Sequence, residues 1–157
     1  MRAGPVRLRP ATPDDAERLW RWRNDPDTRR ASWNEQAVPR AQHERWLADI
    51  LARPDRKLYV ALADGAEVGT VRLDLAEDQA EVSITVAPEC RGGGLAAEML
   101  LALAEEAFSA LALDRLVARV KGSNPASRAA FERAGYHVTA DGPVATLVRE
   151  RPGGNIA

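Results

Sequence analysis

Short stretches in which apolar and polar residues alternate recur along the chain, and this pattern is typical of half-buried strands. The stretches end at proline or glycine signals, and Asp64-Gly65 and Asp141-Gly142 each stand between two of them. Aspartate-glycine pairs favour tight turns, so both pairs predict antiparallel hairpins. The pattern predicts strands at residues 6–9, 58–62, 68–73, 81–86, 115–120, 136–139 and 144–148.

Apolar residues at intervals of three and four predict four helices between these strands. The first opens where Thr12 can cap it and Pro13 suits its first position, and it ends before Pro26. The last opens at Asn124 and stops at Gly135, because glycine readily takes the left-handed conformation of a helix end. The helices are expected at residues 12–25, 39–53, 95–111 and 124–134, with an irregular stretch around Trp33.

The order of these elements predicts one α/β domain, of the α+β kind, in which helices flank a mixed, mostly antiparallel sheet. A chain of 157 residues has the size of a single domain with one core. Its 45% hydrophobic and 29% charged residues are ordinary for a globular protein. We expect the domain to span residues 1–151 and a flexible tail to follow at 152–157.

Charge and cysteine content exclude several classes of function. The net charge is −1 and the 22 basic residues are scattered, which argues against nucleic-acid binding. Because Cys90 is the only cysteine, no internal disulfide and no cysteine-based zinc site can form, and we expect no metal. The apolar stretches are too short to cross a bilayer and none resembles a signal peptide, so we expect a cytoplasmic protein without membrane contact. A monomer and a homodimer both remain open.

The most informative motif is the run Arg91-Gly92-Gly93-Gly94-Leu95-Ala96, which joins a predicted strand to a predicted helix. Glycines let backbone N–H groups converge without Cβ atoms in the way, and the start of a helix adds partial positive charge. The turn therefore suits a phosphate group. It lacks the Gly-Lys-Ser/Thr of a P-loop and the spacing of a dinucleotide-binding motif. A glycine turn with no ligand is the alternative.

A second motif starts with Asn124-Pro125-Ala126-Ser127 and continues through Phe131-Glu132-Arg133 to Gly135-Tyr136. Together the two motifs resemble the R/Q-x-x-G-x-G/A and N-x-x-S-x-x-x-Y/F-E-K-x-G-F/Y signatures of the GNAT acetyltransferase superfamily. The resemblance covers nearly the whole chain. It implies acetyl-CoA as the acyl donor and a sheet splayed open between the strand ending at Val86 and the one ending at Val120. The cofactor-binding residues that it implies are Ile84, Val86, Arg91, Gly92, Gly93, Gly94, Leu95, Ala96, Asn124, Ser127 and Phe131.

Transfer of an acetyl group from a thioester to an amine needs a neutral amine and a proton for the departing thiolate. Glu81 is the best candidate for the base, because it begins the strand that leads to the glycine turn and the family often places a carboxylate there. A solvent-facing charge is the alternative. The family's usual proton donor is a tyrosine at the position of Phe131, and a phenyl ring cannot donate a proton. We therefore hypothesise that Ser127 or a water molecule protonates the thiolate, while Asn124 positions the cofactor arm.

The acceptor is indicated by the run from Trp20 to Asn24 and the later run from His43 to Trp46. They are similar to the W-R-N…H-x-x-W pattern of acetyltransferases that modify 4-amino sugars on UDP, a pattern also found among ribosomal-protein N-terminal acetyltransferases. The similarity implies that Arg23 and His43 face the acceptor. An arginine can pair with a diphosphate, and a tryptophan such as Trp33 offers a flat face to a base or a sugar ring. For His43 a purely structural role is the alternative.

These observations together predict an acetyl-CoA-dependent N-acetyltransferase that acts on a primary amine of a small molecule, with a nucleotide-linked 4-amino sugar as the favoured acceptor. An N-terminal acetyltransferase that acts on a protein or peptide is the first alternative. A catalytically silent acyl-CoA-binding module is the second, and the phenylalanine at position 131 keeps it open.

Overall fold

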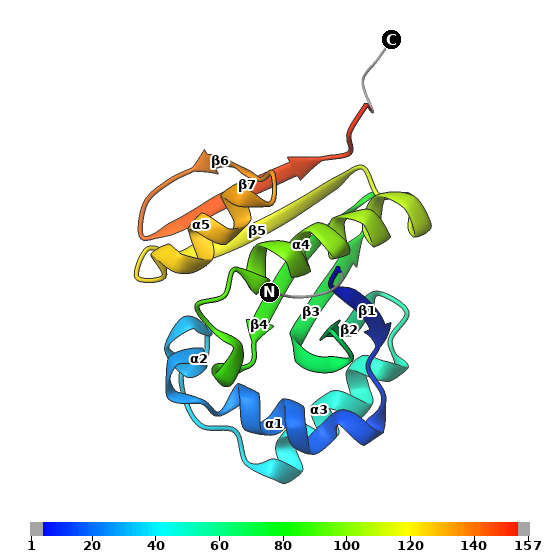
Figure 1. Ribbon diagram of the computed structural model, residues 1–157, viewed down its shortest axis with the longest axis vertical. Helices are drawn as coiled ribbons and strands as arrows, with labels where there is room; N and C mark the ends of the chain where they lie inside the picture. The colour runs from blue at the N-terminus through cyan, green and yellow to red at the C-terminus, as the bar shows by residue number, and fades with distance from the viewer. Residues whose placement is uncertain (1–4, 154–157) are drawn as a thin grey trace.

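The computed structural model describes residues 5–153, which form one sheet with helices on both of its faces (Figure 1). Seven strands pair in the order β1-β2-β3-β4-β5-β7-β6. All seven lie where the alternating pattern predicted strands. Their bounds are β1 Arg7–Pro10, β2 Arg56–Ala63, β3 Ala66–Ala76, β4 Gln79–Val86, β5 Arg115–Lys121, β6 His137–Ala140 and β7 Val144–Glu150.

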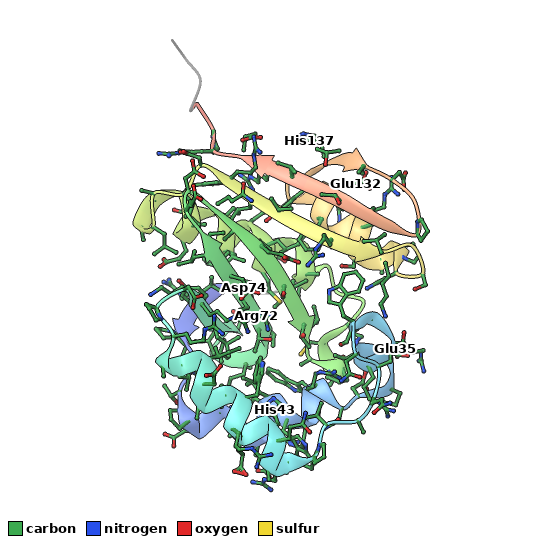
Figure 2. All side chains as sticks on the ribbon, turned by 180° about the vertical axis from the view of Figure 1, so that it is seen from behind. Glu35, His43, Arg72, Asp74, Glu132 and His137 are labelled. Carbon is green, nitrogen blue, oxygen red and sulfur yellow. The ribbon has the colours of Figure 1, made fainter. Side chains whose placement is uncertain are left out.

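The sheet opens between its two central strands. Neighbouring strands are antiparallel except β4 and β5, which are parallel and pair over only three residues, 79–81 with 115–117. Beyond this short stretch the two strands diverge, as Figure 2 shows from behind. The predicted sheet, mixed, mostly antiparallel and splayed in the middle, is therefore confirmed.

The helices divide the interior into two cores, one on each face of the sheet. Successive residues of β2 point to opposite sides, because side chains alternate along a strand. Tyr59 and Ala61 belong to the larger core under α4 and α5, whereas Leu58 and Val60 belong to the smaller core formed with α1 and α3. The helices are α1 Ala16–Arg23, α2 Pro26–Ala31, α3 Arg40–Ala52, α4 Leu95–Glu105 and α5 Pro125–Arg133.

Helix α2 was not predicted, since the stretch around Trp33 was expected to be irregular from residue 26 onward. Pro26 takes the first helical position, and the Asp25 carboxylate accepts hydrogen bonds from the backbone N–H groups of Asp27 and Thr28, both at 3.1 Å. Such a cap stabilises the start of a helix. No residue of α2 is buried, so the helix leaves no hydrophobic pattern in the sequence.

Two predicted helices have irregular ends. The helix predicted at 95–111 is α-helical only to Glu105 and continues as one π-helical turn, Glu106–Ala110, which a hydrogen bond from the Leu111 N–H to the Glu106 carbonyl closes. The first predicted helix begins as a 3-10 turn, Pro13–Asp15, capped by Thr12 as expected. A third short turn, Pro88–Cys90, precedes the glycine run.

The chain after β7 is exposed at Pro152 and Gly153, and the rest of the predicted tail lies outside the described residues. Within residues 5–153, no helix has the length and apolar character needed to span a membrane. The same part of the chain contains no group of three or more histidine, cysteine or acidic side chains arranged to hold a metal ion.

Candidate active site

A pocket of about 420 Å³ lies in the opening between β4 and β5. The sheet forms its floor, and α1, α3, α5 and the loop after α2 form its walls. Figure 2 views this opening, with Arg72, His43 and Glu35 labelled around it. A cavity of this volume is in the usual range for a small-molecule site. Eight residues proposed from the sequence line it: Arg23, Trp33, His43, Glu81, Ile84, Asn124, Ser127 and Phe131.

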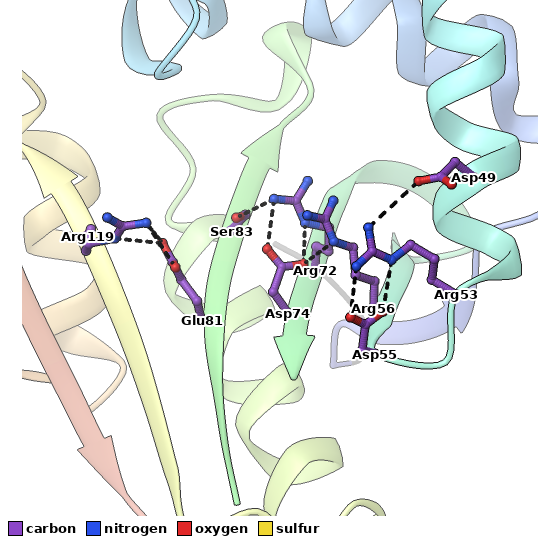
Figure 3. Close-up of polar contacts among 9 residues, drawn as sticks. All are labelled: Asp49, Arg53, Asp55, Arg56, Arg72, Asp74, Glu81, Ser83 and Arg119. Carbon is purple, nitrogen blue, oxygen red and sulfur yellow. Dashed lines mark hydrogen bonds and ion pairs between the residues drawn. The ribbon is translucent and has the colours of Figure 1, made fainter. Parts of the chain in front are cut away.

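Glu81 lies at the closed end of the opening, where β4 makes its last pair with β5. Its two carboxylate oxygens accept hydrogen bonds from Nε and Nη2 of Arg119 on β5, at 2.9 and 3.1 Å (Figure 3). The Arg119 guanidinium also lies 5.7 Å from the ring centroid of Trp33. Glu81 is thus a carboxylate in the pocket wall, and a guanidinium already balances its charge.

Arg72 was not predicted from the sequence as a site residue, although it lines the same pocket. Its guanidinium donates to the Asp74 carboxylate at 3.0 and 3.2 Å and to the Ser83 hydroxyl at 3.3 Å (Figure 3). It lies 6.0 Å from the ring centroid of Trp46. The signal that could have found it is the register of the β3–β4 hairpin, which places Arg72 opposite Ser83, two residues beyond Glu81.

Asn124 and Ser127 enter the pocket from the start of α5. The side-chain oxygen of Asn124 accepts a hydrogen bond from the Ser127 backbone N–H at 3.2 Å and so caps the helix. The amide nitrogen of Asn124 can donate to a ligand, and its oxygen keeps a second lone pair. Phe131, one helical turn further on, is 3% exposed, and its ring meets Tyr136 edge-on with centroids 4.9 Å apart.

Neither tyrosine of the chain can take the place of the tyrosine that the family has at the position of Phe131. Tyr59 and Tyr136 both belong to the core under α4 and α5, and neither lines the pocket. Burial raises the pKa of Tyr59 to about 12 and raises that of Tyr136 as well. Ser127 or a water molecule therefore remains the candidate proton donor.

Arg23 and His43 both line the pocket, and each has a buried nitrogen without a partner among the described residues. The Nη2 of Arg23 donates to the Asn34 carbonyl at 2.6 Å, but its Nη1 is unpaired. Burial, with the charge of Arg29, lowers the pKa of Arg23. His43 is 4% exposed with Nδ1 unpaired, and burial, followed by the charge of Arg23, lowers its pKa.

Four basic residues line the pocket: Arg23, Arg72, Arg119 and Lys121. Carboxylates balance three of these charges, because Arg72 pairs with Asp74, Arg119 with Glu81 and Lys121 with Glu35. Among the described residues, Arg23 bonds to a backbone carbonyl and to no carboxylate. The buried, unpaired Nη1 of Arg23 can bind an anion through a charge-assisted hydrogen bond. The pocket therefore suits a ligand that carries a phosphate or a carboxylate.

The glycine turn lies beyond the end of β4, outside the pocket. Gly94 takes φ +77° and forms the cap of α4, and no side chain caps this helix among the described residues. A Cβ on Gly94 would meet no atom within 4 Å, so the backbone conformation, not crowding, favours glycine here. The first N–H groups of α4 have no partner within the helix, which leaves the turn able to bind an anion.

Arg91, the first residue of the glycine motif, turns away from the glycines toward α2. Its Nη2 donates to the Asp25 carboxylate at 2.6 Å and to the Thr28 hydroxyl at 2.7 Å. Of the predicted cofactor residues, Ile84, Asn124, Ser127 and Phe131 come together at the pocket, and Val86 continues β4 from there toward the turn.

Solved structures of N-acetyltransferases share this fold. The structure of the aminoglycoside acetyltransferase AAC(6′)-Ib in complex with coenzyme A and kanamycin matches with a TM-score of 0.82 at 21% identity, over 93% of this chain and 95% of that chain. The structure of spermidine N-acetyltransferase from Vibrio cholerae in complex with CoA and spermine matches with a TM-score of 0.85 at 18% identity, over 93% and 95%. Among curated proteins no sequence matches the chain. At such low identities the likeness defines the fold.

The family follows from the sequence match. The family model for the acetyltransferase (GNAT) domain matches residues 6–137, which include the opened part of the sheet and both motifs. The chain therefore belongs to the GNAT acetyltransferase family, as its motifs predicted.

Proposed function

We propose that this protein transfers an acetyl group from acetyl-CoA directly to a primary amine of a small molecule that carries an anionic group. The observation that carries this proposal is the pocket in the split sheet. Glu81, Ser127 and Arg23, with its unpaired nitrogen, all line this one pocket. The side chains that we propose for proton transfer and for acceptor binding therefore line the same cavity.

The donor is acetyl-CoA, bound in two parts. The N–H groups of residues 92–96, at the start of α4, hold the pyrophosphate, because helix starts and glycine-rich turns bind anions. The pantetheine arm pairs with the free backbone edge of β4 near Ile84 and Val86 and passes Asn124 and Phe131. The likeness to structures that contain CoA or acetyl-CoA supports this assignment.

Glu81 and Ser127 divide the proton transfers. Glu81 accepts a proton from the acceptor ammonium, directly or through water, and frees the amine to attack the thioester carbonyl. The tetrahedral intermediate then collapses and the carbon–sulfur bond breaks. The thiolate takes a proton from the Ser127 hydroxyl or from water, and that oxygen takes the second proton of the attacking nitrogen, so that a neutral amide and the CoA thiol are formed. Glu81 returns its proton to solvent. Arg119 keeps the Glu81 carboxylate oriented toward the pocket through its two hydrogen bonds.

The favoured acceptor is a nucleotide-linked 4-amino sugar. Its diphosphate would meet Arg23, and Trp33 would offer a face to the base or the sugar. The structures of similar fold hold kanamycin and spermine, which carry several positive charges. The charge of Arg23, which no carboxylate among the described residues balances, disfavours such ligands on its side of the pocket.

A panel of acceptors tests the proposal through the release of CoA thiol from acetyl-CoA. We expect release with a UDP-linked 4-amino sugar, and none with spermidine, kanamycin or an N-terminal peptide. Turnover with the peptide alone would favour a protein N-terminal acetyltransferase. Binding of acetyl-CoA without turnover of any amine would favour the silent module, to which the phenylalanine at position 131 points.

Arg23→Leu tests the recognition of an anionic group, because it removes the guanidinium and with it the unpaired Nη1. We expect the acceptor KM to rise about tenfold or more, as for the loss of a charge-assisted contact. Arg21→Leu, on the exposed side of α1, is the matched control and should leave the KM unchanged. Equal effects of the two substitutions would contradict an anion site at Arg23.

A further inference from the structure

The segment 25–35, which we call the strap, comprises α2 and the start of the loop after it, and it spans the open end of the split sheet. No residue of α2 is buried, so apolar packing does not hold the strap in place. On the β4 side its first residues are fastened by Arg91, which bonds to Asp25 and Thr28. Figure 1 shows α2 next to the chain segment between β4 and α4.

On the β5 side the strap is fastened by Lys121, the last residue of β5. The Nζ of Lys121 donates to the carbonyl of Arg30 at 3.1 Å, to the carbonyl of Ser32, and to the carboxylate of Glu35 at 2.9 Å. The Lys121 side chain is 16% exposed. Its ammonium thus uses all three N–H groups on one segment of chain.

The identity of this residue is chemically specific. The chain contains 20 arginines but only two lysines, Lys57 and Lys121. Three oxygens that surround one point match a compact ammonium, whereas the donors of a planar guanidinium diverge. The position therefore calls for lysine in a chain that otherwise uses arginine.

The contacts of Lys121 reach the acceptor wall. Its Nζ lies 5.8 Å from the ring centroid of Trp33, which is itself 56% exposed and lines the pocket. Next in sequence, Asn34 also lines the pocket, and its carbonyl accepts the hydrogen bond from Arg23. Fixing residues 30, 32 and 35 fixes the two wall residues between them.

We propose that Lys121 is a positioning residue for the acceptor: it ties the strap to β5 so that Trp33 and Asn34 form the acceptor wall. The inference rests on the proposed function, because it takes the pocket as the place where the amine substrate binds. Among the described residues the Lys121 ammonium bonds only to the strap, and the Lys121 carbonyl that accepts from the Asn124 N–H at 2.9 Å is kept when the side chain is changed. Loss of this tie should therefore weaken acceptor binding and spare acetyl-CoA binding.

Lys121→Met tests the proposal, because it keeps most of the aliphatic stem and removes every donor. With a UDP-linked 4-amino sugar we expect the acceptor KM to rise about tenfold or more, with a smaller change in kcat and an unchanged calorimetric Kd for acetyl-CoA. Lys57→Met, at the other lysine, should match the wild type. An unchanged acceptor KM, or an equal loss of acetyl-CoA affinity, would overturn the proposal.

Hydrogen exchange in the free protein separates a failure of this inference from a failure of the proposed function. We expect the amides of residues 32–36 to exchange about tenfold faster in Lys121→Met, while those of β4 keep the wild-type rate. If the wild-type protein acetylates no amine, the proposed function fails. The hydrogen-exchange measurement then still tests whether Lys121 fixes Trp33 and Asn34. Equal exchange in both proteins refutes the tie.

Discussion

At the scale of single residues, the pairing of Glu81 with Arg119 determines how the carboxylate can act. Both oxygens of Glu81 accept hydrogen bonds from one guanidinium, which fixes the direction of the carboxylate. A carboxylate has further lone pairs, so a water molecule or an amine can still approach it. In the proposed mechanism Glu81 therefore accepts the proton from a fixed position at the closed end of the pocket.

Glu81→Gln tests this role. The amide keeps the shape of the side chain but cannot accept the proton, so we expect kcat/KM to fall about 100-fold or more. The calorimetric Kd for acetyl-CoA should stay the same. Glu150→Gln is the matched control, because Glu150 also pairs across strands, with Arg115 at 3.0 Å, outside the pocket. Wild-type kcat/KM in Glu81→Gln would refute the role.

The proton donor is tested by changing Ser127 and Phe131. We expect Ser127→Ala to lower kcat about tenfold or more, because a general acid contributes at least that much. Adding Phe131→Tyr to Ser127→Ala should restore part of the loss, since the new phenol would lie in the pocket wall where the family has its tyrosine. Stopped-flow release of thiol measures both steps. Normal kcat in Ser127→Ala would assign the proton to water.

At the scale of elements, the glycine turn gives α4 an uncapped start beside the end of β4. Gly92 and Gly94 both have positive φ, at +83° and +77°, whereas Gly93 does not. The turn therefore uses its glycines for two different reasons. Gly92 and Gly94 allow the left-handed backbone conformation of the turn. Gly93 has no side chain to cover the N–H groups of the turn.

Gly94→Ala tests the backbone requirement. The left-handed conformation should cost about 1 kcal/mol of unfolding free energy, measured by urea denaturation. We also expect acetyl-CoA to bind about tenfold more weakly, because the N–H groups at the start of α4 shift. Gly93→Ala adds the same methyl group without strain and should keep the wild-type stability. Equal unfolding free energies for the two variants would contradict the assigned conformations.

The sequence predicted the family and, within residues 5–153, the seven strands and four of the five α-helices, because each leaves a local pattern. Helix α2 was not predicted, because none of its residues is buried and its sequence therefore lacks the helical spacing of apolar residues. Arg119 and Lys121 alternate with buried residues on β5, so the sequence could predict that both lie on the same face of this strand. The sequence could not predict that this face borders the pocket, because the pocket depends on the parallel pairing of β4 with β5 over three residues. Such pairing between distant strands has no local signal in a single sequence.

At the scale of the whole molecule, the pocket borders the smaller core. His43 lies at this border, and we expect it to make the free energy of unfolding depend on pH. His43 lies beside the smaller core and is buried without a partner for Nδ1 among the described residues. Burial and the charge of Arg23 lower its folded-state pKa below 6.5. The unfolded chain therefore binds this proton at a higher pH than the folded protein does.

The sign of the effect follows from proton linkage. Above about pH 7 both states carry a neutral His43 and it adds no slope. As the pH falls below 6.5 the unfolded state gains the proton first, so the unfolding free energy decreases, by up to about 1 kcal/mol per pH unit. Urea denaturation at pH 7.5 and 5.5 measures this loss. His43→Gln should reduce it, and His137→Gln, at an exposed position, should not.

The central proposal is that the protein transfers an acetyl group from acetyl-CoA to an amine in the split of the sheet. Mass spectrometry of a UDP-linked 4-amino sugar, incubated with acetyl-CoA and the protein, tests it most directly. We predict that the sugar gains the mass of one acetyl group, that one CoA thiol appears for each acetylated sugar, and that Glu81→Gln slows both together. An unchanged sugar mass in the presence of a protein that binds acetyl-CoA would contradict the account.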